Sequence, residues 1–411
     1  MWIGLWDDHG QCFGDLYSQG SQSTDLAWIV GQQLDTGNFQ IFQYTRDDTV
    51  LTTIFWEAQV QIGIDRIQSF VLQDVSRDLL FESNPSTFVV AICGWMFEGV
   101  TRLVIDNGLT YELEMWKYAT DVKERDTRPD QGHRHGANRQ ASLMNVDVRT
   151  NAQGFRGPAI AERAAPGVAR IAFVGDSTTM GWGVAEKETF ANQVVEMLAK
   201  QGYKVDGFNE GVGNWNTTQE LTNFREVGAK MKPDIVALTY FINDGEPMPI
   251  YPKESWLDRN SAAWIVINYR LDSLIRAFGE RPDWKKYYRD LYKDDAPGWQ
   301  ATQKALKGFA ETAKAIGAKI VVFHLPELRE LKPYPFPDVT EKVKKAVDAA
   351  GMPFVDMLPA VETLEPASLW VTVPDPHPNG KADIAFAAFM VKTLAPMLDE
   401  LCKTQNKGCK Q

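Results

Sequence analysis

From about residue 170 onward, the sequence alternates short apolar runs with amphipathic stretches, and this alternation restricts the chain to few folds. The apolar runs predict strands at 171–174, 205–209, 235–240, 319–324 and 353–357. The other stretches predict helices at 188–200, 217–231, 302–316, 340–350 and 382–401. Strands alternating with helices form a parallel sheet covered on both faces, so we expect an α/β fold.

The first predicted strand ends in a tight turn that carries a hydroxyl group. Gly175, Asp176 and Ser177 follow the strand and lead toward a helix. Ligand sites in such sheets lie beyond the carboxyl ends of the strands, and the N–H groups at a helix start favour negative charge. Ser177 therefore stands where a nucleophile is useful. A role as the cap of the helix is the alternative.

A proline-rich segment at 373–379 predicts a catalytic base. Its three prolines each push the preceding residue into the extended region, so Asp375 and His377 should point to one side, about 6.6 Å apart along the strand. A carboxylate on one imidazole nitrogen leaves the other free to accept a proton from a hydroxyl. The alternatives are a rigid surface loop and a different base, His324, which has no acid near it in the sequence.

Two further turns at strand ends carry groups that can stabilise a negative charge. A glycine-rich turn at 209–217 follows the second strand and should aim the backbone N–H of Gly213 or Asn214 outward. Asn243 follows the third strand, and its side-chain amide can donate to an oxyanion. An Asx-turn made by Asn243 and Asp244 is the alternative.

These four motifs, in this order, resemble the SGNH/GDSL hydrolase family over residues 145–401. The resemblance implies a three-layer α/β/α, flavodoxin-like fold and serine esterase or acyl-transfer chemistry, with no metal and no cofactor. It makes Ser177 the nucleophile, His377 the base and Asp375 the acid that orients the base.

The resemblance also implies an oxyanion hole formed by the Ser177 N–H, the Asn243 side chain and a backbone N–H for which we take Gly213. The sequence departs from the family pattern at three places. Phe241 replaces a glycine, Asn214 aligns with the usual glycine of the second motif, and the acid precedes the histidine by two residues where many members have three. The second departure leaves Asn214 as the alternative to Gly213.

Residues 1–144 lie outside the resemblance, and we expect them to form a separate N-terminal region. Alternating aromatic and polar residues near its start suggest short strands or loosely ordered chain. The polar segment 124–138 suggests an exposed linker, so we assign 124–144 as linker and 145–411 as the hydrolase domain. His133 and His135 form a His-x-His pair, but no ligand set accompanies them, so we expect no metal there.

The apolar run 88–97 is too short for a bilayer, which takes about 20 residues. We expect a buried helix or strand. A membrane anchor or the core of a signal peptide is the alternative, so a membrane tether stays open.

Charge and cysteine content limit the partners and the compartment. The formal net charge of −11 and a pI near 5.1 argue against nucleic acid as a partner. Cys402 and Cys409 flank a polar tail and can close a small loop in an oxidising compartment, whereas two free thiols are the alternative. An extracytoplasmic or cell-envelope location is favoured.

The segment 245–298 interrupts the alternation and should be a helical insertion that shapes the substrate site. It contains, or is followed directly by, eight aromatic residues: Trp256, Trp264, Tyr269, Trp284, Tyr287, Tyr288, Tyr292 and Trp299. Such rings suit sugars or acyl chains, or they pack a lid onto the core. Many similar proteins with an N-terminal extension act on polysaccharide, so we expect an O-acyl, most simply acetyl, ester on a glycan. An acyltransferase with the same residues and a non-catalytic glycan-binding protein are the alternatives.

Overall fold

The computed structural model describes residues 28–33, 39–44, 50–59, 69–73, 85–251, 254–278, 283–373 and 375–410. The chain divides into two compact units, residues 1–96 and 97–411. The first unit contains a four-stranded antiparallel sheet in the order β1-β2-β3-β4. Its strands are β1 (Trp28–Gln33), β2 (Phe39–Tyr44), β3 (Val50–Gln59) and β4 (Ser69–Gln73).

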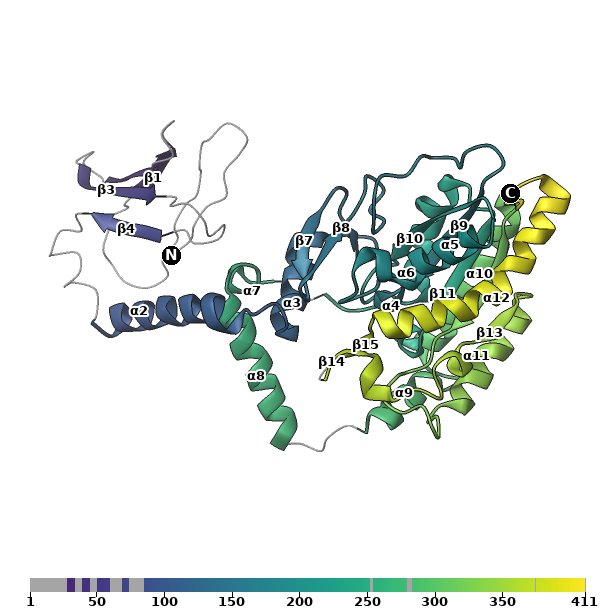
Figure 1. The fold of residues 1–411 in the computed structure, drawn as a ribbon. Coiled ribbons are helices and arrows are strands. Elements are labelled where there is room, and N and C mark those ends of the chain that lie inside the picture. The colour runs from purple at the N-terminus through teal and green to yellow at the C-terminus, as the bar shows by residue number, and fades with distance from the viewer. Residues whose placement is uncertain are drawn as a thin grey trace. The chain divides into compact units, whose positions relative to one another are not determined.

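The second unit is built on a five-stranded parallel sheet (Figure 1). The strand order is β10-β9-β11-β12-β13, the order of flavodoxin-like folds. The strands are β9 (Ala169–Gly175), β10 (Val205–Gly211), β11 (Ile235–Tyr240), β12 (Lys319–His324) and β13 (Phe354–Asp356). Each strand coincides closely with its prediction, and the expected α/β fold is confirmed.

Alternate residues of the strands face opposite layers of helices. Ile171 and Phe173 of β9 belong to one hydrophobic cluster, with α5 and α12, whereas Ala172 and Val174 belong to another, with α6, α10 and α11. The helices are α5 (Phe190–Lys200), α6 (Thr217–Glu226), α10 (Pro297–Ile316), α11 (Pro337–Ala349) and α12 (Gly380–Gln405). The sheet is therefore buried on both faces, as its almost wholly apolar strands require.

Helix ends differ from the predictions for local reasons. α10 and α11 begin several residues early because Pro297 and Pro337 occupy the first turn, where proline loses no hydrogen bond.

Short helices follow several strands and loops: α4 (Ser177–Met180), η3 (Glu186–Glu188), η4 (Gly228–Met231), η5 (Ile242–Gly245), η6 (Leu358–Ala360) and η7 (Pro366–Leu369). The hairpin β14 (Trp370–Thr372) and β15 (Asp375–Pro378) precedes α12.

The segment predicted as an exposed linker is folded onto the sheet unit. It forms the hairpin β5 (Lys123–Arg125) and β6 (His133–His135), then the hairpin β7 (Gln140–Leu143) and β8 (Val146–Arg149). The prediction of an exposed linker over 124–144 is wrong, because Gln131, His133 and His135 are buried. The second unit starts at residue 97, well before the predicted 145.

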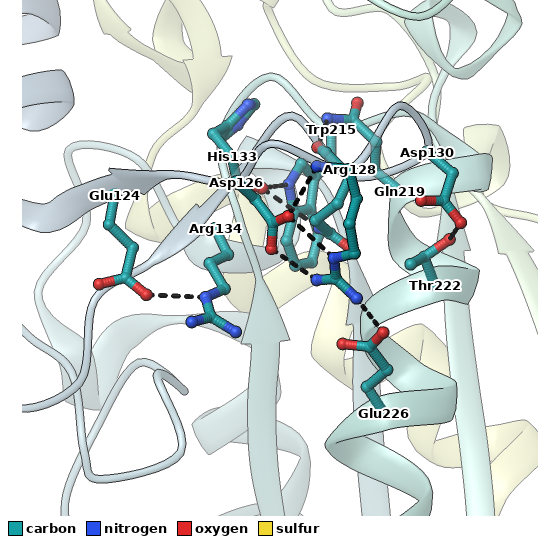
Figure 2. A network of polar contacts seen from close by, with 11 residues as sticks. Glu124, Asp126, Arg128, Asp130, His133, Arg134, Trp215, Gln219, Thr222 and Glu226 are labelled. Atoms are coloured by element: carbon teal, nitrogen blue, oxygen red, sulfur yellow. Dashed lines mark hydrogen bonds and ion pairs between the residues drawn. The ribbon is translucent and has the colours of Figure 1, made fainter.

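Some polar residues of this segment bond to α6 (Figure 2). Arg128 pairs with Glu226, and the Gln219 amide donates to the Gln131 carbonyl. Polar composition alone does not distinguish a solvated segment from one that is bonded to a polar helix, which explains the wrong prediction.

The apolar run 88–97 lies in α2 (Pro85–Val100), which continues into η1 (Thr101–Ile105), α3 (Tyr111–Lys117) and η2 (Tyr118–Val122). The prediction of burial is wrong for Ile92, Trp95 and Phe97, which are 43%, 66% and 39% exposed. Apolar composition favours burial, but it does not determine which apolar side chains pack against the rest of the fold. Among the described residues, no helix combines the length and apolarity needed to cross a bilayer.

The insertion is helical, as predicted, with α7 (Trp256–Asn260), α8 (Ala262–Phe278) and α9 (Trp284–Leu291). Its aromatic residues divide between the two interpretations. Trp256 and Tyr287 are exposed, whereas Tyr292 and Trp299, the latter in α10, are buried in the hydrophobic core. At the end of α12, Cys402 and Cys409 form a disulfide, one of the two alternatives that the sequence leaves open.

Candidate active site

Ser177 stands at the carboxyl end of the strand β9, the second strand of the sheet. β9 ends at Gly175, and Ser177 is the first residue of α4. A Cβ on Gly175 would lie 2.1 Å from Thr179 Oγ1 and 2.2 Å from Thr239 Oγ1, so only glycine allows this turn. The cap of α4 is Asp176, whose carboxylate accepts a backbone N–H of the first turn. The alternative role of Ser177 as the cap is therefore not observed.

Ser177, His377 and Asp375 form a continuous hydrogen-bonded row. Ser177 Oγ lies 2.9 Å from His377 Nε2, and His377 Nδ1 lies 2.5 Å from Asp375 Oδ1. Asp375 and His377 share a face of the extended strand β15, as the proline argument predicts. The carboxylate holds the proton on Nδ1, which leaves the Nε2 lone pair facing the hydroxyl.

Trp182 is a fourth member of this row that the sequence did not indicate. Its indole N–H donates to Asp375 Oδ2 over 2.8 Å, and its ring lies against His377 at a centroid distance of 6.3 Å. Burial alone would raise the pKa of Asp375, but the hydrogen bonds from His377 and Trp182 bring it below its usual value. The acid therefore stays ionised, and both of its oxygens are fixed.

Arg156 fixes the loop that follows Ser177. Its guanidinium is buried and donates to the carbonyls of Met180, Gly181 and Val184 over 2.5 to 2.6 Å. Burial lowers the pKa of Arg156 to about 10, which leaves it charged at neutral pH. Nothing in the local sequence marks Arg156, because its partners are backbone groups more than twenty residues away.

Asn243 follows β11, which pairs with β9 in parallel. The two strand ends therefore meet, and η5 carries Asn243 at the edge where Ser177 stands. The Asx-turn alternative is not observed. Asp244, not Asn243, accepts the backbone N–H of Phe241, and the Asn243 oxygen is buried without a hydrogen-bond partner in the described part of the chain.

The assignment of Gly213 to the oxyanion hole is wrong. The Gly213 N–H donates to the Tyr118 hydroxyl over 2.8 Å, and its carbonyl accepts from His133 Nε2 over 2.9 Å. Both backbone groups are thus occupied. The next residue, Asn214, has a left-handed backbone with φ of +65°, and no described residue accepts its N–H.

His133 and His135 are structural residues of this loop and offer no free nitrogen to a metal. His133 contacts Tyr251 and Gly213, and His135 contacts Tyr118 and the Gly154 carbonyl. Burial, reinforced by the charge of Lys123, lowers the pKa of both rings to about 3, so both are neutral at pH 7. The Tyr118 hydroxyl can then accept from Gly213 and donate to His135.

His324, the alternative base, is buried at the end of β12 and stacks on Tyr240. Neither ring nitrogen has a hydrogen-bond partner among the described residues. Burial lowers the pKa of His324 to about 4. Of the two histidines, His377 is the one in contact with Ser177.

Comparison with known proteins identifies a family. A model described as the GDSL-like Lipase/Acylhydrolase family matches residues 173–382, just over half of the chain. Among curated proteins, none matches the chain.

Several solved structures are similar at low identity. A lipase/acylhydrolase from Enterococcus faecalis is 15% identical, with 56% of this chain and 97% of that one covered and a TM-score of 0.36. TesA is 17% identical, with 56% and 99% covered and a TM-score of 0.37. A catalytic mutant of Axe2, an acetylxylan esterase from Geobacillus stearothermophilus, is 17% identical, with 55% and 93% covered and a TM-score of 0.36.

Proposed function

The chain belongs to the GDSL-like lipase/acylhydrolase family of ester-hydrolysing enzymes, and from this premise we propose that it removes an O-acyl group through an acyl intermediate on Ser177. The observation that carries the proposal is the row Ser177–His377–Asp375, with contacts of 2.9 and 2.5 Å. A hydroxyl, an imidazole and a buried carboxylate in this order are the requirements for nucleophilic acyl transfer.

In the first half of the reaction, Ser177 Oγ attacks the ester carbonyl while His377 Nε2 takes the hydroxyl proton. Asp375 stabilises the imidazolium that forms, and Trp182 keeps the carboxylate in place. The tetrahedral intermediate then collapses. His377 returns the proton to the leaving alcohol oxygen, and the acyl group stays on Ser177.

Three donors are proposed for the oxyanion: the backbone N–H groups of Ser177 and Asn214 and the side-chain amide of Asn243. Support comes from their position after three adjacent parallel strands, β9, β10 and β11. Neither backbone N–H has an acceptor in the described part of the chain. Donors that are fixed before the reaction stabilise the charge as it develops.

In the second half, water attacks the acyl-serine. His377 Nε2 takes a proton from the water, the same three donors hold the second tetrahedral intermediate, and its collapse releases the carboxylic acid and restores the Ser177 hydroxyl. The net reaction is ester plus water to acid plus alcohol.

As substrate we propose an O-acetyl ester of a glycan. Exposed aromatic rings on the insertion, such as Trp256 and Tyr287, suit the apolar faces of sugars. The Cys402–Cys409 disulfide supports an extracytoplasmic location, where exported polysaccharide is found.

The test is active-site labelling combined with product analysis. A fluorophosphonate probe should label the wild-type protein and fail on Ser177→Ala, and the wild type should release acetate from an acetylated oligosaccharide. A wild type that is neither labelled nor active on short p-nitrophenyl esters would overturn the proposal. Acetyl groups appearing on an acceptor sugar in place of free acetate would identify a transferase with the same residues.

A further inference from the structure

A cavity of about 460 Å³ opens beside the proposed oxyanion donors. Asn214 and Asn243 form one wall, the hairpin β5–β6 contributes Lys123, and the start of the insertion contributes Tyr251. A substrate whose carbonyl is held by Asn214 and Asn243 would have this cavity beside it. A substrate class assigned from this cavity rests on the esterase activity proposed above.

The hairpin wall is held in place before any ligand arrives. The indole N–H of Trp215 donates to the His133 carbonyl, and Arg128 bridges Asp126 and Glu226 on α6 (Figure 2). These contacts anchor the hairpin to the helix that follows the glycine-rich loop. The side chains that the hairpin turns toward the cavity are therefore preorganised.

Lys123 is the charge in this wall that has no counter-ion. Its Nζ donates to Asn214 Oδ1 over 2.9 Å and lies 4.4 Å from the centre of the Tyr118 ring. No carboxylate of the described chain forms an ion pair with it. An amide oxygen and an aromatic face orient an ammonium group but leave its charge uncompensated.

The other charged residues of the wall already have partners. Arg125 pairs with Glu254, which also pairs with Arg259, and Glu124 pairs with Arg134. Glu246 accepts the Tyr287 hydroxyl, and burial raises its pKa, which favours its neutral form. Among the described residues that line the cavity, Lys123 is the cation without an ion pair.

Burial lowers the pKa of Lys123 to about 7, so the charged form is costly in the empty cavity. A negatively charged group bound next to Nζ would remove that cost. We propose that the cavity binds an anionic substituent on the alcohol part of the ester, a carboxylate or a phosphate, and that Lys123 selects such substrates. The substrate class is then an acylated acidic glycan.

The test compares sugars that carry the same O-acetyl group and differ in one substituent: methyl glucoside, methyl glucuronoside and methyl glucoside 6-phosphate. Wild type should prefer an anionic sugar over the neutral one in kcat/KM. Lys123→Met should reduce that preference roughly tenfold, mainly through KM, because a charged hydrogen bond is lost. Lys123→Arg should restore most of it. The exposed Lys200, changed to Met, is the matched control and should leave the preference intact.

The preference is the ratio of kcat/KM for an anionic sugar to kcat/KM for the neutral one, measured on the same protein. Each outcome therefore supports or overturns the proposal. A weaker fold or a misplaced Asn214 lowers the rates on all three sugars together and leaves the ratio unchanged. An unchanged ratio in Lys123→Met, or a wild type without preference, overturns the proposal. Comparison of the methyl glucuronoside with the methyl glucoside 6-phosphate shows whether the cavity prefers a carboxylate or a phosphate.

Binding separates this inference from the proposed chemistry. Calorimetry with Ser177→Ala and the deacetylated methyl glucuronoside or glucoside 6-phosphate requires no turnover. Binding of either anion that Lys123→Met abolishes supports the cavity assignment even if the wild type hydrolyses nothing. Hydrolysis of neutral esters without anion binding would support the proposed esterase activity and overturn the assignment of an acidic glycan as the substrate.

Discussion

The sheet and the segment before it contribute to the site in different ways. The ends of β9 and β11 and the strand β15 carry Ser177, Asn243 and His377, all within the family match. Tyr118 and Arg156 lie before the match, touch no triad residue, and hold backbone groups of the loops that carry the chemistry. The reacting groups are carried by the regular elements of the sheet unit. The segment before the family match, here called the extension, holds the loops around them in place.

If this division is correct, substitutions in the sheet should abolish chemistry without unfolding the protein. Substitutions in the extension should have smaller effects on rate and larger effects on loop geometry or stability. Four variants, ordered from the largest expected effect to the smallest, test the division.

His377→Ala should reduce kcat by about 10⁴-fold, because His377 is the base in contact with Ser177 among the described residues. Initial rates on p-nitrophenyl acetate give the measurement. His324→Phe is the control, since the buried ring of His324 stacks on Tyr240 and its nitrogens have no hydrogen-bond partner among the described residues. An active His377→Ala together with an inactive His324→Phe would transfer the role of the base to His324.

Asn243→Ala should reduce kcat by roughly 10²- to 10³-fold, about 3 kcal/mol of transition-state stabilisation, through loss of one oxyanion donor. KM should change little, since the donor acts mainly on the developing charge. Asn192→Ala, on the exposed face of α5, should keep full activity. Equal kcat values for the two variants would show that Asn243 does not stabilise the oxyanion.

Arg156→Met should lower the free energy of unfolding by roughly 3 kcal/mol, because buried carbonyls of Met180, Gly181 and Val184 lose their donor. Chemical denaturation followed by tryptophan fluorescence measures the change. Arg149→Met removes an exposed pair with Glu186 and should cost less than about 1 kcal/mol. Similar losses in both variants would contradict the bracing role of Arg156.

Tyr118→Phe should reduce kcat by up to about tenfold with a smaller change in KM, because the Gly213 N–H loses its acceptor and the Asn214 N–H is less well aimed. Tyr203→Phe is the matched control, since the Tyr203 hydroxyl bonds Asp399 on α12 and not the loop. Full activity of Tyr118→Phe would mean that the sheet alone determines the geometry of this loop. It would contradict the division of roles between the sheet and the extension.

The sequence predicted the sheet, its helices and the contact between His377 and Ser177 because each rests on a local pattern. Strand and helix periods are visible in short windows, and the prolines of 373–379 fix which way Asp375 and His377 point. These features require no knowledge of distant residues.

The rest depends on contacts between residues far apart in the chain. Trp182 bonds Asp375 across nearly two hundred positions, and Tyr118 reaches Gly213 from outside the family match. From the sequence we take Gly213 for the oxyanion hole, yet the left-handed residue of the loop is Asn214. Asparagine tolerates that conformation better than most residues, so glycine alone did not locate the turn.

The attachment of Gly213 to Tyr118 and His133 also limits how far the protein can be shortened. A recombinant fragment trimmed to 173–382 would keep Ser177, His377 and Asp375 but leave both backbone groups of Gly213 without partners. Such a fragment would also lose the start of β9 and most of α12, so its poor turnover would report a disturbed fold and say nothing about the chemistry. Expression trials are best begun with fragments that start near residue 97.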